Sequence, residues 1–128
     1  MLVLYPIKAL IQNQIEQWIE LLKPLDLAPG FIDGSVDTGL RMEILRTRRV
    51  VLMTPDVAHA WFMSHLSDRA VANSRRKLRL LILDEAHVYD GVFGTNMAFF
   101  LRRLQAVSGP HCLICSTATL SAPTDFIY

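Results

Sequence analysis

An apolar run that ends in two adjacent carboxylates is the feature that most constrains this chain. Five of the six residues 78–83, Leu-Arg-Leu-Leu-Ile-Leu, are apolar, and the polar stretch 73–77 precedes them. A short apolar run with polar boundaries is typical of a strand buried on both faces of a parallel sheet. Asp84 and Glu85 follow at its carboxyl end, where open α/β sheets bind their ligands. We therefore expect a functional site at this point.

Two neighbouring carboxylates have a definite chemical use. One can hold Mg²⁺, usually through water because this ion dehydrates reluctantly. Its neighbour can orient and deprotonate an attacking water. The alternative is structural, with Asp84 capping the following turn and Glu85 facing solvent. The pair by itself leaves both interpretations open.

The rest of the chain alternates between strand-like and helix-like patterns, which predicts an α/β fold with a mostly parallel sheet. We expect the helix at 38–45 to begin at Asp37 or Thr38, and the next one to have Thr54 as its N-cap and Pro55 as its first residue. The polar stretch 67–77 is predicted as a loop or a frayed helix end. Strands are predicted at residues 1–5, 29–34, 48–53, 78–83 and 111–115, and helices at 9–23, 38–45, 54–66 and 95–107.

Composition limits the class of protein. A chain of 128 residues with 52% apolar residues can form one domain with a real core. It contains no uninterrupted apolar run of about 18 residues and no signal-peptide pattern, so we predict a cytoplasmic protein without membrane contact. The net charge is only +1, but nine of the thirteen basic residues lie between Arg41 and Arg79. They form either a positive patch on one side or solvated loops, and the sequence favours neither.

Cys112 and Cys115 have the spacing of a metal or redox pair, but they lie in a strand-like run. Residues three apart on a strand point to opposite faces, so these thiols can neither share a metal ion nor readily form a disulfide. We predict that both are buried structural thiols.

Residues 84–87, Asp-Glu-Ala-His, spell the DEAH form of motif II in superfamily 2 helicases. Three further stretches resemble motifs of this family, in the family's order and at predicted strand ends. Residues 5–10 resemble motif Ia, residues 54–56 motif Ib and residues 117–119 motif III. The extension from Asp84 to Leu104 is most similar to the RecQ-related, YprA-like DNA helicases.

The resemblance implies a fold and a site. The fold would be a partial RecA-like three-layer α/β/α sandwich with a mostly parallel sheet. ATP and Mg²⁺ would bind at motif II, where Asp84 would hold the metal through water and Glu85 would activate the hydrolytic water. His87 would link the site to the strand-moving parts, and the hydroxyls of Thr117 or Thr119 would reach Asp84 or His87.

The resemblance also implies contacts with nucleic acid, DNA rather than RNA. Ile7 stands where motif Ia usually has threonine, which removes one hydroxyl donor, while Lys8 keeps the cation. The helix beginning after Thr54 would present free N–H groups that can grip a phosphate. The residues that this resemblance assigns to nucleic acid are Pro6, Lys8, Gly34, Thr54, Pro55 and Asp56.

No G-x-x-x-x-G-K-[ST] pattern occurs in the sequence, so the usual cradle for the β- and γ-phosphates is missing. In the family this loop precedes motif Ia, and a second RecA-like domain follows motif III. The resemblance therefore implies that residues 1–128 are a partial ATP-binding domain, from motif Ia through motif III, whose partners are the remaining helicase segments. The sheet would lack the P-loop strand, which leaves the edge at residues 112–115 unpaired. The alternative is a non-catalytic nucleic-acid-binding or assembly module that keeps the fold.

Overall fold

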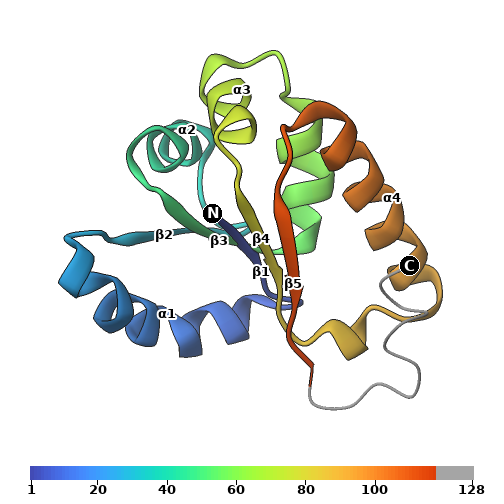
Figure 1. The fold of residues 1–128 in the computed structure, drawn as a ribbon, viewed down its shortest axis with the longest axis horizontal. Coiled ribbons are helices and arrows are strands. Elements are labelled where there is room, and N and C mark those ends of the chain that lie inside the picture. Colours follow the sequence, from blue (N-terminus) through green and yellow to red (C-terminus); the bar gives the residue numbers. More distant parts are fainter. Residues whose placement is uncertain (118–128) are drawn as a thin grey trace.

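A five-stranded parallel sheet forms the middle of the molecule (Figure 1). The computed structural model describes residues 1–117. Its strands lie in the order β2-β3-β1-β4-β5, and each is parallel to its neighbours. They are β1 (Leu2–Leu4), β2 (Pro29–Ile32), β3 (Val50–Met53), β4 (Leu80–Leu83) and β5 (Cys112–Cys115). All five predicted strands are therefore present.

Helices cover both faces of the sheet and make three layers (Figure 1). Helix α1 (Lys8–Leu22) packs on one face, where Val3 and Leu52 share an apolar cluster with Ile11. On the other face lie α2 (Thr38–Thr47), α3 (Arg69–Arg76) and α4 (Gly91–Val107), together with the helical turns η2 (Val57–Trp61) and η3 (Phe62–Ser64). Two more short turns are η1 (Lys23–Leu25) and η4 (Ala86–Val88). The predicted α/β/α sandwich is confirmed.

The strands divide their side chains between the two faces because successive strand residues point in opposite directions. Along β1, Leu2 and Leu4 enter the larger cluster, while Val3 enters the α1 cluster. Strand β4 follows the same rule, since Leu81 and Leu83 are buried in the larger cluster and Ile82 packs against the smaller one. No helix within residues 1–117 has the length and apolar character needed to cross a membrane.

The helix starts are mostly where side-chain capping predicts them. Asp37 is the N-cap of α2, and its carboxylate accepts a hydrogen bond from the Leu40 amide at 3.1 Å. After Thr54 the chain turns helical at Pro55, and the Thr54 carbonyl accepts a bond from Ala58 N at 3.0 Å. Both starts agree with the sequence-based expectation.

The stretch 67–77 was predicted as a loop or frayed helix end, and this is wrong. It contains α3, whose N-cap Asp68 accepts a hydrogen bond from Ala70 N at 2.9 Å. Only Ala70 and Val71 of the helix are buried. Two apolar residues of small or medium size are too few to give a clear helical periodicity, so the polar composition led to the wrong prediction. The helix is stabilised by the tertiary packing of these two residues.

Helix α4 begins at Gly91, four residues before the predicted start at Thr95. Asp90 is its N-cap and accepts a hydrogen bond from Gly91 N at 2.7 Å. Its apolar residues were expected to pack on the core through Met97, Phe100, Leu101 and Leu104; Met97, Phe100 and Leu104 are buried, and Leu101 is partly buried against the same cluster. Gly94 lies so close to the preceding turn that a Cβ atom there would stand 2.6 Å from the Tyr89 carbonyl oxygen. Gly94 therefore allows the first turn of α4 to pack closely against the preceding turn.

Strand β5 is an edge strand, and the predicted burial of its thiols is wrong. Within residues 1–117 it is hydrogen-bonded to β4 alone, as expected for an unpaired edge. Cys112 is exposed, and Cys115 is half-buried, where burial raises the pKa of its thiol. The apolar composition of this strand is that of a central strand, but its position in the sheet leaves Leu113 and Ile114 exposed as well.

Candidate functional site

The carboxyl ends of the strands meet at one edge of the sheet because all strands are parallel. Backbone hydrogen bonds fix this edge: Asp84 N donates to Leu4 O at 3.0 Å and Tyr5 N to Met53 O at 3.1 Å. Ser116 N donates to Leu83 O at 2.8 Å. The segments that begin with Pro6, Thr54, Asp84 and Ser116 therefore leave the sheet side by side, and we call this the carboxyl edge.

Asp84 and Glu85 lie where the sequence predicted, directly after β4, and both side chains are partly exposed. Glu85 has φ 51° and ψ 45°, a left-handed conformation that is uncommon for any residue but glycine. This conformation ends the strand abruptly and starts the turn η4. A hydrogen bond connects this turn to the residue that follows β5, since Ala86 N donates to Ser116 O at 2.8 Å.

His87 joins motif II to the residue after β5. Its Nε2 lies 3.2 Å from Glu85 Oε2, and its Nδ1 lies 3.2 Å from Thr117 Oγ1. The contact between Nε2 and the Glu85 carboxylate is an ion pair when the ring is protonated. At Nδ1, the tautomer of the ring decides whether the imidazole or the Thr117 hydroxyl donates the hydrogen bond. The predicted contact between Thr117 and His87 is present, whereas Thr119 lies outside the described residues.

Tyr89 is a neighbour of this site that the sequence did not single out. Its side chain is buried, and its hydroxyl has no hydrogen-bond partner among residues 1–117. Burial raises the pKa of Tyr89 strongly, and the charges of Asp84 and Cys115 raise it further. The phenol is therefore held neutral beside Asp84.

Lys8 and the turn after β2 form a second polar group at the carboxyl edge. Lys8 Nζ lies 3.6 Å from Asp33 Oδ2, and it donates to Ser35 Oγ at 3.3 Å. The backbone N–H and hydroxyl of Ser35 both donate to Asp33 Oδ1, at 2.7 and 2.5 Å. Asp33 and Ser35 were missed as site residues, although Asp33 follows an apolar strand just as Asp84 does. That shared position was the available signal.

Asp33 is buried, with 1% of its surface exposed. Burial by itself would raise the pKa of this carboxyl, but the hydrogen bonds from Ser35 and the charge of Lys8 outweigh it and lower the pKa. A lowered native pKa means that the charged form stabilises the folded state. This contribution is present above the unfolded pKa of about 3.9 and is lost as the pH falls through the native value.

Replacing Asp33 by asparagine is expected to lower the free energy of unfolding by about 1–3 kcal/mol at pH 7, because charge-assisted hydrogen bonds are lost. The loss should shrink as the pH falls below about 4, because the unfolded chain then takes up a proton at this position while the native carboxylate does so only at a lower pH. Urea unfolding at pH 7 and pH 3 measures both effects. Glu20→Gln, at an exposed position on α1, is the control and should change stability little; equal losses for both variants would contradict the assignment.

The remaining predicted nucleic-acid residues differ in accessibility. Pro6 is half-buried, and Gly34 is exposed, with no atom of the described residues within 4 Å of the position that a Cβ would take. Thr54 and Pro55 are buried, and only Asp56 of this trio is exposed. Side-chain contacts from Thr54 and Pro55 to a ligand are therefore not available in this conformation.

The donor set at the carboxyl edge fits magnesium held together with a phosphate ligand. Within residues 1–117, no three His, Cys, Asp or Glu side chains come together to form a metal cage. Mg²⁺ is usually bound by one or two carboxylates, with waters and substrate phosphates completing its coordination. The adjacent carboxylates of Asp84 and Glu85, partly open to solvent, match that pattern.

The family model of the DEAD/DEAH box helicases matches residues 1–126. This chain belongs to that family. An uncharacterized ATP-dependent helicase of Methanocaldococcus jannaschii, MJ1574, is 33% identical over 98% of this chain and 20% of its own length. The uncharacterized ATP-dependent helicase YprA of Bacillus subtilis is 29% identical over 97% of this chain and 17% of its own length. The predicted resemblance to YprA-like helicases is confirmed.

Solved helicase structures share the fold. The crystal structure of the DUF1998 helicase MrfA bound to DNA and AMPPNP superposes with a TM-score of 0.86 at 26% identity, covering 98% of this chain and 18% of that one. The chain thus spans about a fifth of the length of each of these three helicases.

Proposed function

We propose that this chain is part of the ATP-hydrolysing core of a helicase that acts on nucleic acid, with DNA as its partner. The observation that carries the proposal is the chain of contacts from Glu85 through His87 to Thr117. These contacts connect motif II, which is proposed to hydrolyse ATP, to the segment that follows β5. The names of MJ1574 and YprA, and the DNA and AMPPNP bound to MrfA, support the proposal.

Each residue of motif II has a separate role in this proposal. Asp84 holds Mg²⁺ through water, and the bound ion would neutralise charge on the phosphates of ATP. Glu85 orients the attacking water and takes its proton. Because Oε2 of Glu85 already faces His87, Oε1 is the oxygen left for the water. A change in the contact between His87 and Thr117 would then alter the position of the base.

Nucleic acid would bind along the carboxyl edge. Lys8 and Gly34 are exposed there on neighbouring turns, so a phosphate can approach the Lys8 ammonium and the bare backbone of Gly34. Lys8 is paired with Asp33, which reduces its net charge and makes it a positioning donor more than a source of attraction. At residues 54–56 the contact would come from backbone N–H groups, because the Asp56 carboxylate repels phosphate.

The proposal requires helicase segments beyond these 128 residues. The sequence holds no P-loop pattern, so the cradle for the β- and γ-phosphates would come from another part of a longer protein, as would a second RecA-like domain. We retain a cytoplasmic location as part of the proposal.

The test is ATP hydrolysis by a longer protein that contains this segment, with and without single-stranded DNA. Replacing His87 by alanine is expected to lower the DNA-stimulated rate by about tenfold or more, because Glu85 and Thr117 lose their common partner. His59→Ala, at an exposed histidine, is the control. No stimulation of the unmodified protein by any nucleic acid would overturn the proposed function, and an unchanged rate for His87→Ala would remove the coupling role.

A further inference from the structure

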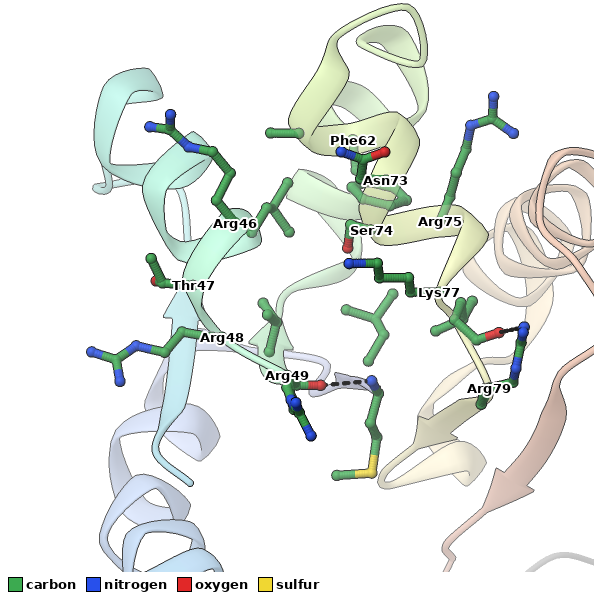
Figure 2. A pocket seen from close by; sticks show the side chains of 16 residues that line it. Arg46, Thr47, Arg48, Arg49, Phe62, Asn73, Ser74, Arg75, Lys77 and Arg79 are labelled. Atoms are coloured by element: carbon green, nitrogen blue, oxygen red, sulfur yellow. Dashed lines mark hydrogen bonds between the residues drawn. The ribbon is translucent and has the colours of Figure 1, made fainter. Parts of the chain in front are cut away.

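A basic cleft lies at the amino ends of the strands, opposite the carboxyl edge, where β3 and β4 begin. Its walls are the end of α2 with residues 46–49 and the end of α3 with residues 73–79, and its volume is about 740 Å³ (Figure 2). Six of its lining side chains are cationic, and none is a carboxylate. The six are Arg46, Arg48, Arg49, Arg75, Lys77 and Arg79. The clustering of basic residues in the sequence therefore produces a positive patch.

Four of these cations make neither an ion pair nor a side-chain hydrogen bond within residues 1–117. Among residues 1–117, no carboxylate lies within ion-pair distance of any of the six. Arg75 donates to the Val107 carbonyl, and Arg79 donates to the carbonyls of Leu78 and Arg76. Arg46, Arg48, Arg49 and Lys77 are exposed and make no such side-chain bond within the described part of the chain. A concave site with uncompensated charge concentrates anions.

The other lining groups suit a phosphate ester. Asn73 and Ser74 add amide and hydroxyl donors at the walls, and the floor contains apolar side chains such as Leu45 and Val51. Hydroxyl and amide side chains, together with arginine and lysine, make most contacts to nucleic-acid phosphates. The side chain of Lys77 points back into the cleft, whereas Arg46 and Arg48 project outward from the α2 wall (Figure 2).

We propose that this basic cleft binds the phosphodiester backbone of nucleic acid, as a second contact separate from the carboxyl edge. Five of its six cations are arginines, whose planar guanidinium groups pair with phosphate oxygens in a bidentate way. The volume lies within the range of about 300–1,000 Å³ typical of ligand pockets. The choice of nucleic acid as the polyanion rests on the proposed function, while the location of the cleft does not.

The three lysines of the chain allow one experiment to read both sites. Lys8 lies at the carboxyl edge and Lys77 in the basic cleft. Lys23 is exposed in a neighbouring hollow, beside the carboxylates of Glu20 and Asp26, that Arg48 and Arg49 also line. The chain is acetylated briefly with and without a single-stranded oligodeoxynucleotide, and each lysine is quantified by mass spectrometry. We expect acetylation of Lys77 to fall about threefold or more at low salt, with loss of protection as salt is raised. Lys23, which lies beside Glu20 and Asp26, should be protected less than Lys77.

Each outcome separates the two proposals. Protection of Lys8 without Lys77 would overturn the basic cleft and leave the proposed function intact. Protection of Lys77 without Lys8 would support the cleft and count against the carboxyl-edge contact. Equal protection of Lys77 by a polyglutamate peptide of the same charge would overturn the assignment to nucleic acid and favour an acidic protein segment.

A charge-reversal pair provides the second measurement. The double variant Arg49→Glu, Lys77→Glu is expected to weaken binding of the oligonucleotide about tenfold or more and to flatten its salt dependence. The matched control is Arg102→Glu, Arg103→Glu on the exposed side of α4, which changes the net charge equally. Equal weakening by both variants would overturn the proposal. Circular dichroism checks folding, and the lysine experiment on the unmodified chain remains decisive if the cleft variant unfolds.

Discussion

Replacing Glu85 by glutamine in a longer protein that contains this segment is expected to lower kcat for DNA-stimulated ATP hydrolysis by about 10²- to 10⁴-fold. The amide keeps the size of the side chain and can still accept a hydrogen bond from His87 Nε2, but it cannot take a proton from water. ATP affinity should therefore change little. A phosphate-release assay gives the rate, and equilibrium binding of a fluorescent nucleotide gives the affinity.

Glu43→Gln is the matched control, because Glu43 is an exposed carboxylate on α2. It should leave both the rate and the affinity unchanged. Undiminished turnover of Glu85→Gln would remove Glu85 from the role of base. Loss of nucleotide binding together with turnover would instead indicate that the carboxylate helps to hold the nucleotide.

Replacing Phe100 by alanine is expected to lower the free energy of unfolding by about 3–5 kcal/mol. Phe100 is 1% exposed and belongs to the larger apolar cluster beneath α4. Native domains are stable by only about 5–15 kcal/mol, so this loss would unfold a large part of the population under mild denaturing conditions. Urea unfolding followed by circular dichroism measures the effect.

The neighbouring residue provides the control. Phe99 is 61% exposed on the same helix, so Phe99→Ala should change stability by no more than about 0.5 kcal/mol. The two variants differ by one position and remove the same atoms. Similar losses for both would contradict the packing of α4 through its Met97, Phe100 and Leu104 face.

Local patterns were enough to predict most of the fold. Each strand is an apolar run with polar or turn residues at its ends, as at Leu80–Leu83, and this signal needs no knowledge of the rest of the chain. The prediction that the thiols of β5 are buried was wrong because burial depends on strand order. Its sequence, Cys-Leu-Ile-Cys, is as apolar as that of a central strand, and its position at the edge depends on how distant segments pair.

In the candidate site, too, contacts between neighbouring residues could be predicted, whereas contacts between distant segments could not. The order of Asp84, Glu85 and His87 was predicted from adjacent residues, and their placement after β4 followed from the strand. The pairing of Lys8 with Asp33 joins residues 25 positions apart in sequence. Only the strand order β2-β3-β1, with a single strand between β2 and β1, brings them together. The basic cleft likewise unites the ends of α2 and α3. The sequence showed only that basic residues are concentrated between Arg41 and Arg79, not that they share one surface.

The left-handed backbone at Glu85 has a consequence for any attempt to make this protein more robust. Glycine adopts that conformation without steric penalty, whereas glutamate resists it. A screen that rewards only resistance to heat would therefore select glycine at this position, and it would discard the carboxylate on which the proposed chemistry depends. At position 85, thermal stability favours glycine, whereas the proposed catalysis requires glutamate.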